Sequence, residues 1–289
     1  MHNKVNIMAL GVGTFTDKHK GQDDAHLSQH RARKIPFVVR DEVKKVISNM
    51  LAEGIIEPVD VSPWISPVVI TRKSDGKVRL CVDLRSVNQN IVVDVYPLPN
   101  LNELLTSVKD GRFFSKLDLR SAYHQIRLHP ESKHITAFVT PEGTFQFTRM
   151  PFGLASAASV FQRMMAKMFG DVKGVLFFQD DVLVMGETVN EHNITLRKVL
   201  KVIDETGLSL NKEKCIFLVE EIDYLGYSIS KGSIKPKKSL LEAIKLAPAP
   251  TDKEQLRSFL GLVEYYSKFV EKFASKTEDL RKLLVEERE

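Results

Sequence analysis

Cysteine is scarce in this chain, and its two cysteines lie far apart. The 289 residues contain only Cys81 and Cys215, and neither has a second cysteine or a histidine nearby at zinc-ligand spacing. A disulfide framework and a structural zinc are therefore not expected. Isolated cysteines of this kind are typical of reduced thiols inside a cell.

Long apolar runs are also missing. No segment approaches the roughly 18 residues that a membrane span requires. The apolar stretch at 7–13 is short, is broken by glycines and lacks a small-residue cleavage site. We therefore expect an intracellular protein, cytoplasmic or nuclear, that is not secreted and has no membrane partner.

Neither sign of charge dominates the composition. Lys and Arg total 42 against 37 for Asp and Glu, a net charge of +5. This small excess permits a nucleic-acid partner without requiring one. The chain also lacks a glycine-rich phosphate loop and a Ser/His/Asp signature, so those two chemistries have no support. The apolar content of 43% is sufficient for one large domain or two modest ones.

Apolar periodicity and turn residues predict a mixture of helices and strands. Apolar residues between 41 and 53 recur at helical spacing and are followed by Gly54. The β-rich runs 68–71 and 78–84 flank a turn at 74–76 and predict a hairpin. Later patterns predict a strand over 112–119, a helix over 156–169, a hairpin of 174–178 with 182–185, a helix over 191–206, short strands within 216–229 and a final helical region opened by a capping box of Thr251 and Glu254. Because these elements do not alternate strictly, the predicted class is α+β.

Two consecutive acids, Asp180 and Asp181, separate the apolar runs of the second hairpin. An acid pair in a hairpin is often only turn chemistry, and on the pair alone this alternative stays open. The flanking runs are apolar enough to be buried, which places the acids at the edge of a buried sheet. Neighbouring carboxylates are costly there unless a cation neutralises them. Asp118 ends another apolar strand, and pairing of that strand beside the hairpin would bring three carboxylates together.

Three carboxylates at one sheet edge predict a particular chemistry. Mg²⁺ prefers hard oxygen ligands and binds through a few carboxylates together with substrate phosphates, and Mn²⁺ can replace it. Two such ions about 4 Å apart activate an attacking hydroxyl and stabilise a leaving oxygen in phosphoryl transfer. The sequence thus predicts metal-dependent phosphoryl transfer at Asp118, Asp180 and Asp181.

Seven segments form a recognisable series along the chain. They are SPVV at 66–69, RLCVDLR at 79–85, LDLRSAYHQI at 117–126, MPFGL at 150–154, FQDD at 178–181, YLGY at 224–227 and LRSFLGL at 256–262. In this order they resemble the motifs of gypsy-type LTR-retrotransposon reverse transcriptases, over roughly residues 34–275. The family usually has Tyr at position 178 and a small or branched apolar residue at 179, where this chain has Phe178 and Gln179. Neither departure removes a metal ligand.

The resemblance implies a right-hand polymerase with fingers, palm and thumb, in which helices flank an antiparallel palm sheet. It places the fingers at 35–92 and 128–148, the palm at 93–127 and 149–235, and a thumb-like helical region at 236–289. Residues 1–34 match no motif and are predicted to form a loose arm. No ribonuclease H domain is expected in this chain, because its late acids fall at the spacing of a solvated helix face.

The resemblance also implies roles for individual residues. Asp118, Asp180 and Asp181 would be the catalytic metal ligands, with the backbone carbonyl of Leu119 as an added ligand. The residues that would hold the nucleotide are Lys73 or its rival Arg72, Arg79, Tyr123, Phe152 and Gln179. Those that would contact primer and template are Leu225, Gly226, Tyr227, Lys235, Lys237 and Lys238. Solvated surface charge and core aromatic packing remain the alternatives for the cations and the rings.

The function so predicted is that of an RNA-directed DNA polymerase, a reverse transcriptase. It would add deoxynucleotides from their triphosphates to a primer on an RNA or DNA template. The alternative is a catalytically weak or inactive transposon-derived nucleic-acid-binding protein. The intact acids favour the enzyme, and Gln179 favours the alternative. A different palm-type nucleotidyltransferase is disfavoured by the motifs at 66–85 and 224–227.

Overall fold

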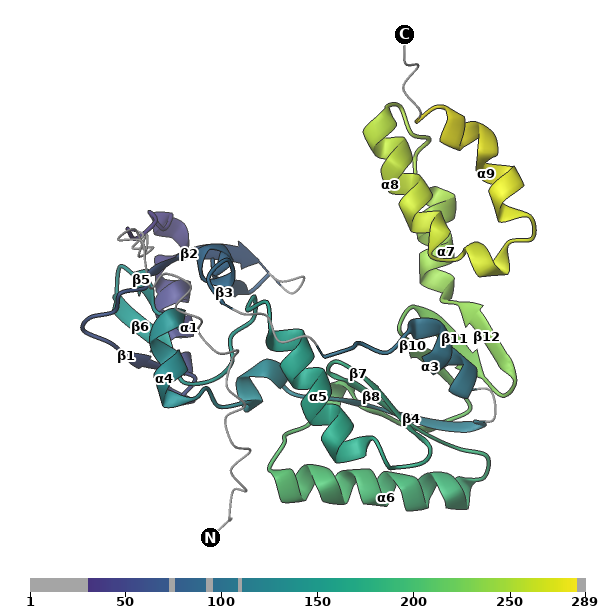
Figure 1. Ribbon diagram of the computed structural model, residues 1–289, viewed down its shortest axis with the longest axis horizontal. Coiled ribbons are helices and arrows are strands. Elements are labelled where there is room, and N and C mark those ends of the chain that lie inside the picture. The colour runs from purple at the N-terminus through teal and green to yellow at the C-terminus, as the bar shows by residue number, and fades with distance from the viewer. Residues whose placement is uncertain (1–30, 73–75, 92–95, 109–110, 285–289) are drawn as a thin grey trace, which may run out of the picture.

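The computed structural model describes residues 31–72, 76–91, 96–108 and 111–284. The arm predicted at 1–34 lies almost entirely outside the described residues. The remainder forms three sheets with associated helices, arranged as an elongated molecule (Figure 1). Within the described part of the chain, no helix is both long and apolar enough to cross a membrane.

The first sheet comes from the N-terminal half of the chain. Its strands follow the order β1-β6-β5-β2-β3, and β2 pairs antiparallel with β3, which confirms the first predicted hairpin. The strands are β1 (Ile56–Pro58), β2 (Ser66–Arg72), β3 (Val78–Val82), β5 (Phe138–Thr140) and β6 (Gly143–Phe147). The helices and 3-10 turns of this part are η1 (Phe37–Val39), α1 (Arg40–Ala52), α2 (Arg85–Asn88), α4 (Pro130–Lys133) and η3 (His134–Thr136). Helix α1 buries Val43 and Ile47, as its apolar spacing predicts.

The second sheet has four antiparallel strands in the order β7-β8-β4-β9. These are β4 (Phe113–Asp118), β7 (Val175–Phe178), β8 (Asp181–Gly186) and β9 (Ile216–Val219). The helical elements of this part are η2 (Ala122–Gln125), α5 (Ala157–Phe169), α6 (Val189–Thr206) and η4 (Lys212–Lys214). Thr188 and Glu191 form a capping box that opens α6, and Gly207 ends it in the left-handed conformation.

The two faces of this sheet pack against different partners, because successive side chains of a strand point to opposite sides. Leu117, Val182 and Val184 belong to the core cluster that also contains the buried residues of α5 and α6. Phe114 and Leu183 belong to a second cluster. That cluster covers only one end of its face, and the other end carries Lys116, Asp118 and Asp181.

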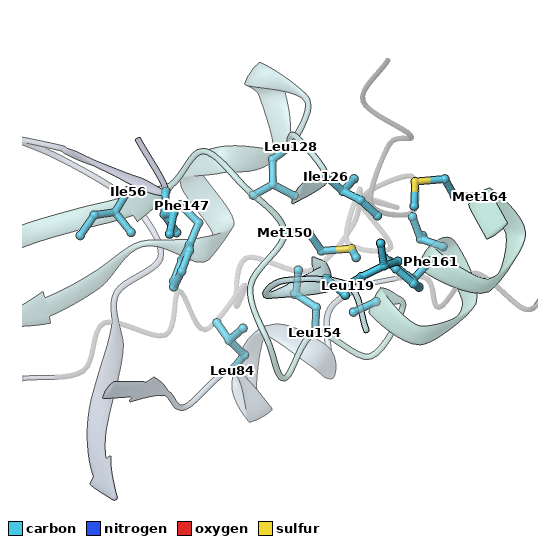
Figure 2. Close-up of a cluster of buried hydrophobic side chains, with 14 of the residues drawn as sticks. Ile56, Leu84, Leu119, Ile126, Leu128, Phe147, Met150, Leu154, Phe161 and Met164 are labelled. Atoms are coloured by element: carbon cyan, nitrogen blue, oxygen red, sulfur yellow. The ribbon is translucent and has the colours of Figure 1, made fainter. Parts of the chain in front are cut away.

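The main core cluster continues from the first sheet into the second without interruption. Figure 2 shows the part of this interior that extends from strands of the first sheet to α5 and to the residue after β4, namely Ile56, Leu84, Leu119, Ile126, Leu128, Phe147, Met150, Leu154, Phe161 and Met164. The two sheets are therefore joined through a shared apolar interior.

The C-terminal part begins with a small sheet, β10-β11-β12 (Glu221–Tyr224, Tyr227–Ser230 and Ser233–Pro236). Helix α3 (Leu101–Ser107) packs beside it through Leu105. The chain then forms α7 (Lys238–Leu246), α8 (Lys253–Glu264), η5 (Ser267–Phe269) and α9 (Phe273–Lys282). These helices stand at the far end of the molecule from the first sheet (Figure 1).

The start of α8 differs from the capping box predicted at Thr251 and Glu254. Asp252 is the N-cap, and its carboxylate accepts from the N–H of Gln255 at 2.7 Å. The side chain of Gln255 in turn accepts from the N–H of Thr251 at 3.1 Å. Two overlapping sequence frames could each cap this helix, and the structure uses the later one.

Candidate active site

The acids predicted to converge come from the two central strands of the second sheet. Asp118 ends β4 and Asp181 begins β8, and the two are direct partners in the antiparallel register. Asp180 precedes Asp181 in the tight turn between β7 and β8, where Gln179 has a positive φ of 53°. Val182, Leu183 and Val184 are fully buried. The buried strands therefore hold the acids at the edge of a rigid core.

The three carboxylates influence one another electrostatically. Burial raises the pKa of Asp118, and the negative charges of Asp180 and Asp181 raise it further, whereas Lys214 and Lys116 oppose the shift. Repulsion of this kind requires the acids to be close neighbours. The structure thus brings together the acids that the sequence singled out.

Two lysines, which the sequence analysis did not single out, neutralise part of this charge. The ammonium of Lys116 lies 2.8 Å from a carboxylate oxygen of Asp181, and that of Lys214 lies 3.9 Å from one of Asp118. Lys116 precedes Asp118 by two residues on β4, so strand alternation places both on the same face. That alternation is the sequence signal that could have identified Lys116.

The donor set fits a hard divalent cation such as Mg²⁺, because three carboxylates supply several oxygen ligands. As the side chains are now placed, no group of three or more His, Cys, Asp or Glu residues within the described ranges forms a ready metal cage. One of the carboxylates already has a cationic partner, because the ammonium of Lys116 contacts Asp181.

A buried hydrogen-bond network fixes strand β4. The Ser115 hydroxyl accepts from the N–H of Leu218 at 3.0 Å and is also hydrogen-bonded with Nε2 of His192 at 2.8 Å. The backbone carbonyl of Asp118 accepts from the N–H of Asn211 at 2.8 Å. These bonds join β4 to β9, to α6 and to the segment before η4. Strand β4 is thereby anchored at Ser115 and at Asp118, the residue that ends it.

Gln162 fixes the turn that carries the other two acids. This residue of α5 is 2% exposed, and its side-chain oxygen accepts from the N–H of Gln179 at 3.0 Å. Its amide group also approaches the carbonyl of Phe177 at 3.5 Å. Gln179 thus contributes its backbone to the shape of the turn.

An aromatic group lies beside the acids. The Tyr123 ring centroid is 5.1 Å from that of Phe152 and 5.5 Å from that of Phe161. Burial raises the pKa of Tyr123, and the charge of Asp180 adds to the increase, which places the phenol near the acids. The guanidinium of Arg79 stacks over Phe152 at 5.3 Å, so a residue of β3 reaches this group from the first sheet.

The other cations predicted to hold a nucleotide are placed differently. Arg72 donates to the carbonyl of Gly76 at 2.7 Å and pairs with Glu42 of α1 at 3.5 Å, so it is engaged by the residue Gly76 before β3 and by α1. Lys73 lies outside the described residues. Of Arg72 and Arg79, the two cations within the described residues, Arg79 is the one that contacts Phe152.

The hairpin predicted at 224–227 is present as the turn between β10 and β11. Leu225 and Gly226 occupy it with positive φ values of 48° and 83°. Tyr265 donates to the carbonyl of Leu225 at 2.9 Å, and Tyr266 donates to that of Gly226 at 3.2 Å. The ring of Tyr227 is buried, so this residue can reach a ligand only through its backbone.

The predicted basic residues lie just beyond this hairpin. Lys235 and Lys238 are exposed. Lys237 is half-buried and pairs with Asp223 at 3.1 Å. Lys235 and Lys238 therefore remain at the surface, while Lys237 is tied to the small sheet.

Solved structures of known proteins share this architecture. The chain is similar to a foamy viral protease-reverse transcriptase in complex with dsDNA, with a TM-score of 0.85 and 25% identity over 96% of this chain and 56% of that chain. It is also similar to the same kind of protein in complex with an RNA/DNA hybrid, with a TM-score of 0.79 and 25% identity over 88% of this chain and 34% of that chain. The predicted α+β polymerase fold is confirmed.

Sequence comparison defines the family. Residues 71–229 match the family described as reverse transcriptase (RNA-dependent DNA polymerase), and the chain belongs to it. The chain is 34% identical over 255 residues to the retrovirus-related Pol polyprotein from transposon opus of Drosophila melanogaster. The aligned region covers 86% of this chain and 25% of the relative. It is also 34% identical over 245 residues to that from transposon gypsy of the same organism, over 82% of this chain and 24% of the relative. The predicted gypsy-type resemblance is confirmed, and the chain spans about a quarter of the length of these relatives.

Proposed function

We propose that this chain is the polymerase core of a reverse transcriptase that adds deoxynucleotides to a primer on an RNA or DNA template. The observation that carries the proposal is the register pairing of Asp118 with Asp181, with Asp180 in the adjoining turn, on a sheet face left open at that end. Family membership gives these acids their chemical context.

Asp118, Asp180 and Asp181 would hold Mg²⁺, with the Leu119 carbonyl as a further ligand. The bound ions would activate the primer hydroxyl and stabilise the leaving oxygen. The strands β4 and β8 would keep the carboxylates in place during the reaction, because the apolar residues of both strands are buried in the core. No rearrangement of the sheet would then be needed at the moment of transfer.

The aromatic group and Arg79 would bind the incoming nucleotide. Arg79, stacked on Phe152, would present a cation to the triphosphate, and Tyr123 contacts that ring and is affected by the charge of Asp180. Lys235 and Lys238, beyond the hairpin of Leu225 and Gly226, would contact template–primer phosphates. The RNA/DNA hybrid in a similar solved structure supports a duplex as the partner.

The test of this function is primer extension on RNA and DNA templates with Mg²⁺ or Mn²⁺. Asp180→Asn keeps the side-chain shape but removes a charge, so extension should fall to less than a tenth of wild type. Asp204→Asn, which makes the same change at an exposed acid of α6, serves as the matched control. Retention of more than a tenth of the activity by Asp180→Asn would rule out this assignment.

The second candidate function is nucleic-acid binding without catalysis. It is favoured by the ion pair of Lys116 with Asp181, which engages one of the proposed metal ligands, and by the amide side chain of Gln179 in the turn. Duplex binding by the wild-type chain without any primer extension, under both metals, would select this candidate.

Tyr123 would exclude ribonucleotides from the proposed pocket. Its ring is held between Phe152 and Phe161, so it cannot retreat from an added 2′-hydroxyl. Tyr123→Val should raise relative ribonucleotide incorporation tenfold or more, about 1.4 kcal/mol of lost discrimination, whereas Tyr123→Phe should behave like wild type. The measurement is the ratio of ribonucleotide to deoxynucleotide incorporation for each base. An unchanged ratio in Tyr123→Val would mean that the ring is only a core aromatic.

A further inference from the structure

Lys116 stands in an unusual position for a lysine. It lies in the middle of β4, on the same face as Asp118, and its side chain is only 21% exposed. Its ammonium is 2.8 Å from Oδ1 of Asp181, and the side chain of Asp181 is 26% exposed. A part-buried ion pair at this distance is screened less by water than a pair on the surface.

The second lysine provides an internal comparison. Lys214 reaches Asp118 from η4 at 3.9 Å, and its side chain is 67% exposed. A long, exposed pair of this kind contributes little, because solvent screens it and the side chain loses freedom on forming it. The two lysines therefore bring the same charge to the same three carboxylates, but the ion pair of Lys116 is shorter and more buried than that of Lys214.

We propose that Lys116 is a built-in counter-ion of the acid group formed by Asp118, Asp180 and Asp181. Its ammonium holds Asp181 in the metal-free protein and must release it when a divalent cation binds. This inference rests on the proposed function and adds to it a residue that sets metal affinity. Lys116 is a positioning residue, since it acts on the reaction through Asp181. Lys214 has at most a minor part in this competition.

Competition between an ammonium and a metal ion has a direct thermodynamic consequence. When only a fraction of the molecules has Asp181 free, the apparent dissociation constant of the metal is raised by the reciprocal of that fraction. Removing the ammonium should therefore tighten metal binding. It should also destabilise the metal-free protein, because three neighbouring carboxylates then lack their nearest cation.

The experiment is a titration of the full chain with Mn²⁺, in the absence of nucleotide and nucleic acid. Free Mn²⁺ is followed by electron paramagnetic resonance, so the readout is independent of polymerase activity. Lys116→Met keeps the length and apolar stem of the side chain, and Lys116→Gln is a second neutral variant in case Met perturbs folding. We expect both to bind Mn²⁺ about tenfold more tightly than wild type. Lys116→Arg, which keeps the charge, should bind like wild type.

Two controls separate the counter-ion from a general change of charge. Lys214→Met removes one positive charge from the same group and should change the dissociation constant less than twofold. Asp181→Asn combined with Lys116→Met should abolish the gain. Thermal unfolding without metal should show Lys116→Met melting below wild type, with the difference disappearing as Mn²⁺ is added.

The outcomes distinguish this inference from the proposed function. Equal Mn²⁺ affinities for wild type, Lys116→Met and Lys116→Gln, together with loss of binding in Asp181→Asn, would overturn the counter-ion and leave the metal site standing. A tightening in Lys214→Met as large as in Lys116→Met would also overturn it. If neither wild type nor any Lys116 variant binds Mn²⁺ without nucleotide, the counter-ion is refuted, and primer extension alone then decides the function.

Discussion

Gln162 shows how one buried amide can shape a site that it does not enter. It holds the backbone of Gln179 from α5, and Gln179 adopts the positive φ that the turn requires. The turn then places Asp180 and Asp181 at the sheet edge. A side chain 17 residues away in sequence thus helps to determine where two carboxylates stand.

Replacing Gln162 by Met should loosen this turn. The N–H of Gln179 would lose its partner, and an unsatisfied polar group in a part-buried site costs about 1–3 kcal/mol of stability. We expect that loss in urea unfolding, with a larger decrease in kcat than in the affinity for nucleotide. Met165→Leu, a buried change on the same helix, controls for altered packing. A variant with wild-type kcat would show that the turn holds its shape without Gln162.

His124 is a second residue whose surroundings give a measurable property. Its ring packs against Phe147 and Phe152, with centroids 6.2 Å and 5.1 Å away. Burial, and then the charges of Arg79 and Arg149, lower the pKa of His124 to about 4. The unfolded chain regains the ordinary pKa of about 6.5 and therefore binds more protons than the folded chain between these values.

The sign of the pH effect follows from this difference in bound protons. The stabilisation from neutral His124 is complete above about pH 6.5 and is lost as the pH falls toward 4. We expect the difference in unfolding free energy between wild type and His124→Phe to change by about 1–3 kcal/mol across that range. Urea unfolding at several pH values measures it. Parallel pH curves for the two proteins would contradict the expectation.

At the scale of elements, the β10–β11 turn and the end of α8 form one unit. The hydroxyls of Tyr265 and Tyr266 donate to the carbonyls of Leu225 and Gly226, and the Tyr227 ring stacks on Tyr265 with centroids 5.5 Å apart. Both turn carbonyls therefore have a hydroxyl donor from a segment about 40 residues away, and that of Gly226 also accepts from the N–H of Lys237 at 3.0 Å.

Removing these two hydroxyls should uncouple the turn from the helices. Tyr265→Phe with Tyr266→Phe keeps both rings but leaves two carbonyls without these donors, at a cost of about 1 kcal/mol per bond. We expect faster hydrogen exchange in the peptide covering 221–230 and little change in β4. Tyr96→Phe, outside this cluster, is the control. Unchanged exchange at 221–230 would mean that ring packing alone joins the two elements.

Elements with strong local patterns were predictable from the sequence, as was the convergence of Asp118 with Asp180 and Asp181, but most side-chain contacts between distant residues were not. The apolar runs flanking Asp180 and Asp181 predicted β7 and β8 because a buried strand needs little more than apolar residues and a turn. The start of α8 was misplaced by one residue because Thr251 and Asp252 both open a plausible cap. Strand alternation alone places Lys116 on the face of Asp118. The contact of Gln162 with Gln179 depends on how α5 packs against the turn, and no local pattern encodes that.

At the scale of the whole molecule, burial is unevenly distributed. The central strands β4 and β8 are packed on both faces, and they join a core that runs into the first sheet (Figure 2). By contrast, α8 buries only Leu256 and Leu260, α9 only Thr277, and α7 no residue. The helices beyond β12 therefore have a smaller share of the apolar contacts that resist local opening.

Hydrogen exchange should divide the molecule along this line. Amides of α8 and α9 should exchange faster than those of β4 and β8, with opening free energies below that of global unfolding. Exchange followed by mass spectrometry over a range of denaturant concentrations would separate the two classes. Equal protection of α9 and β8 would show instead that the whole chain opens as one cooperative unit.

The direct pairing of Asp118 with Asp181 limits how the chain can change length. Because side chains alternate between faces, one inserted residue within Phe113–Asp118 would turn Asp118 toward the buried side and bring an apolar neighbour to the open face. No substitution at a single position would reverse that slip, whereas a second insertion could. Insertions and deletions among homologues should accordingly gather in the connections and spare the interiors of β4 and β8.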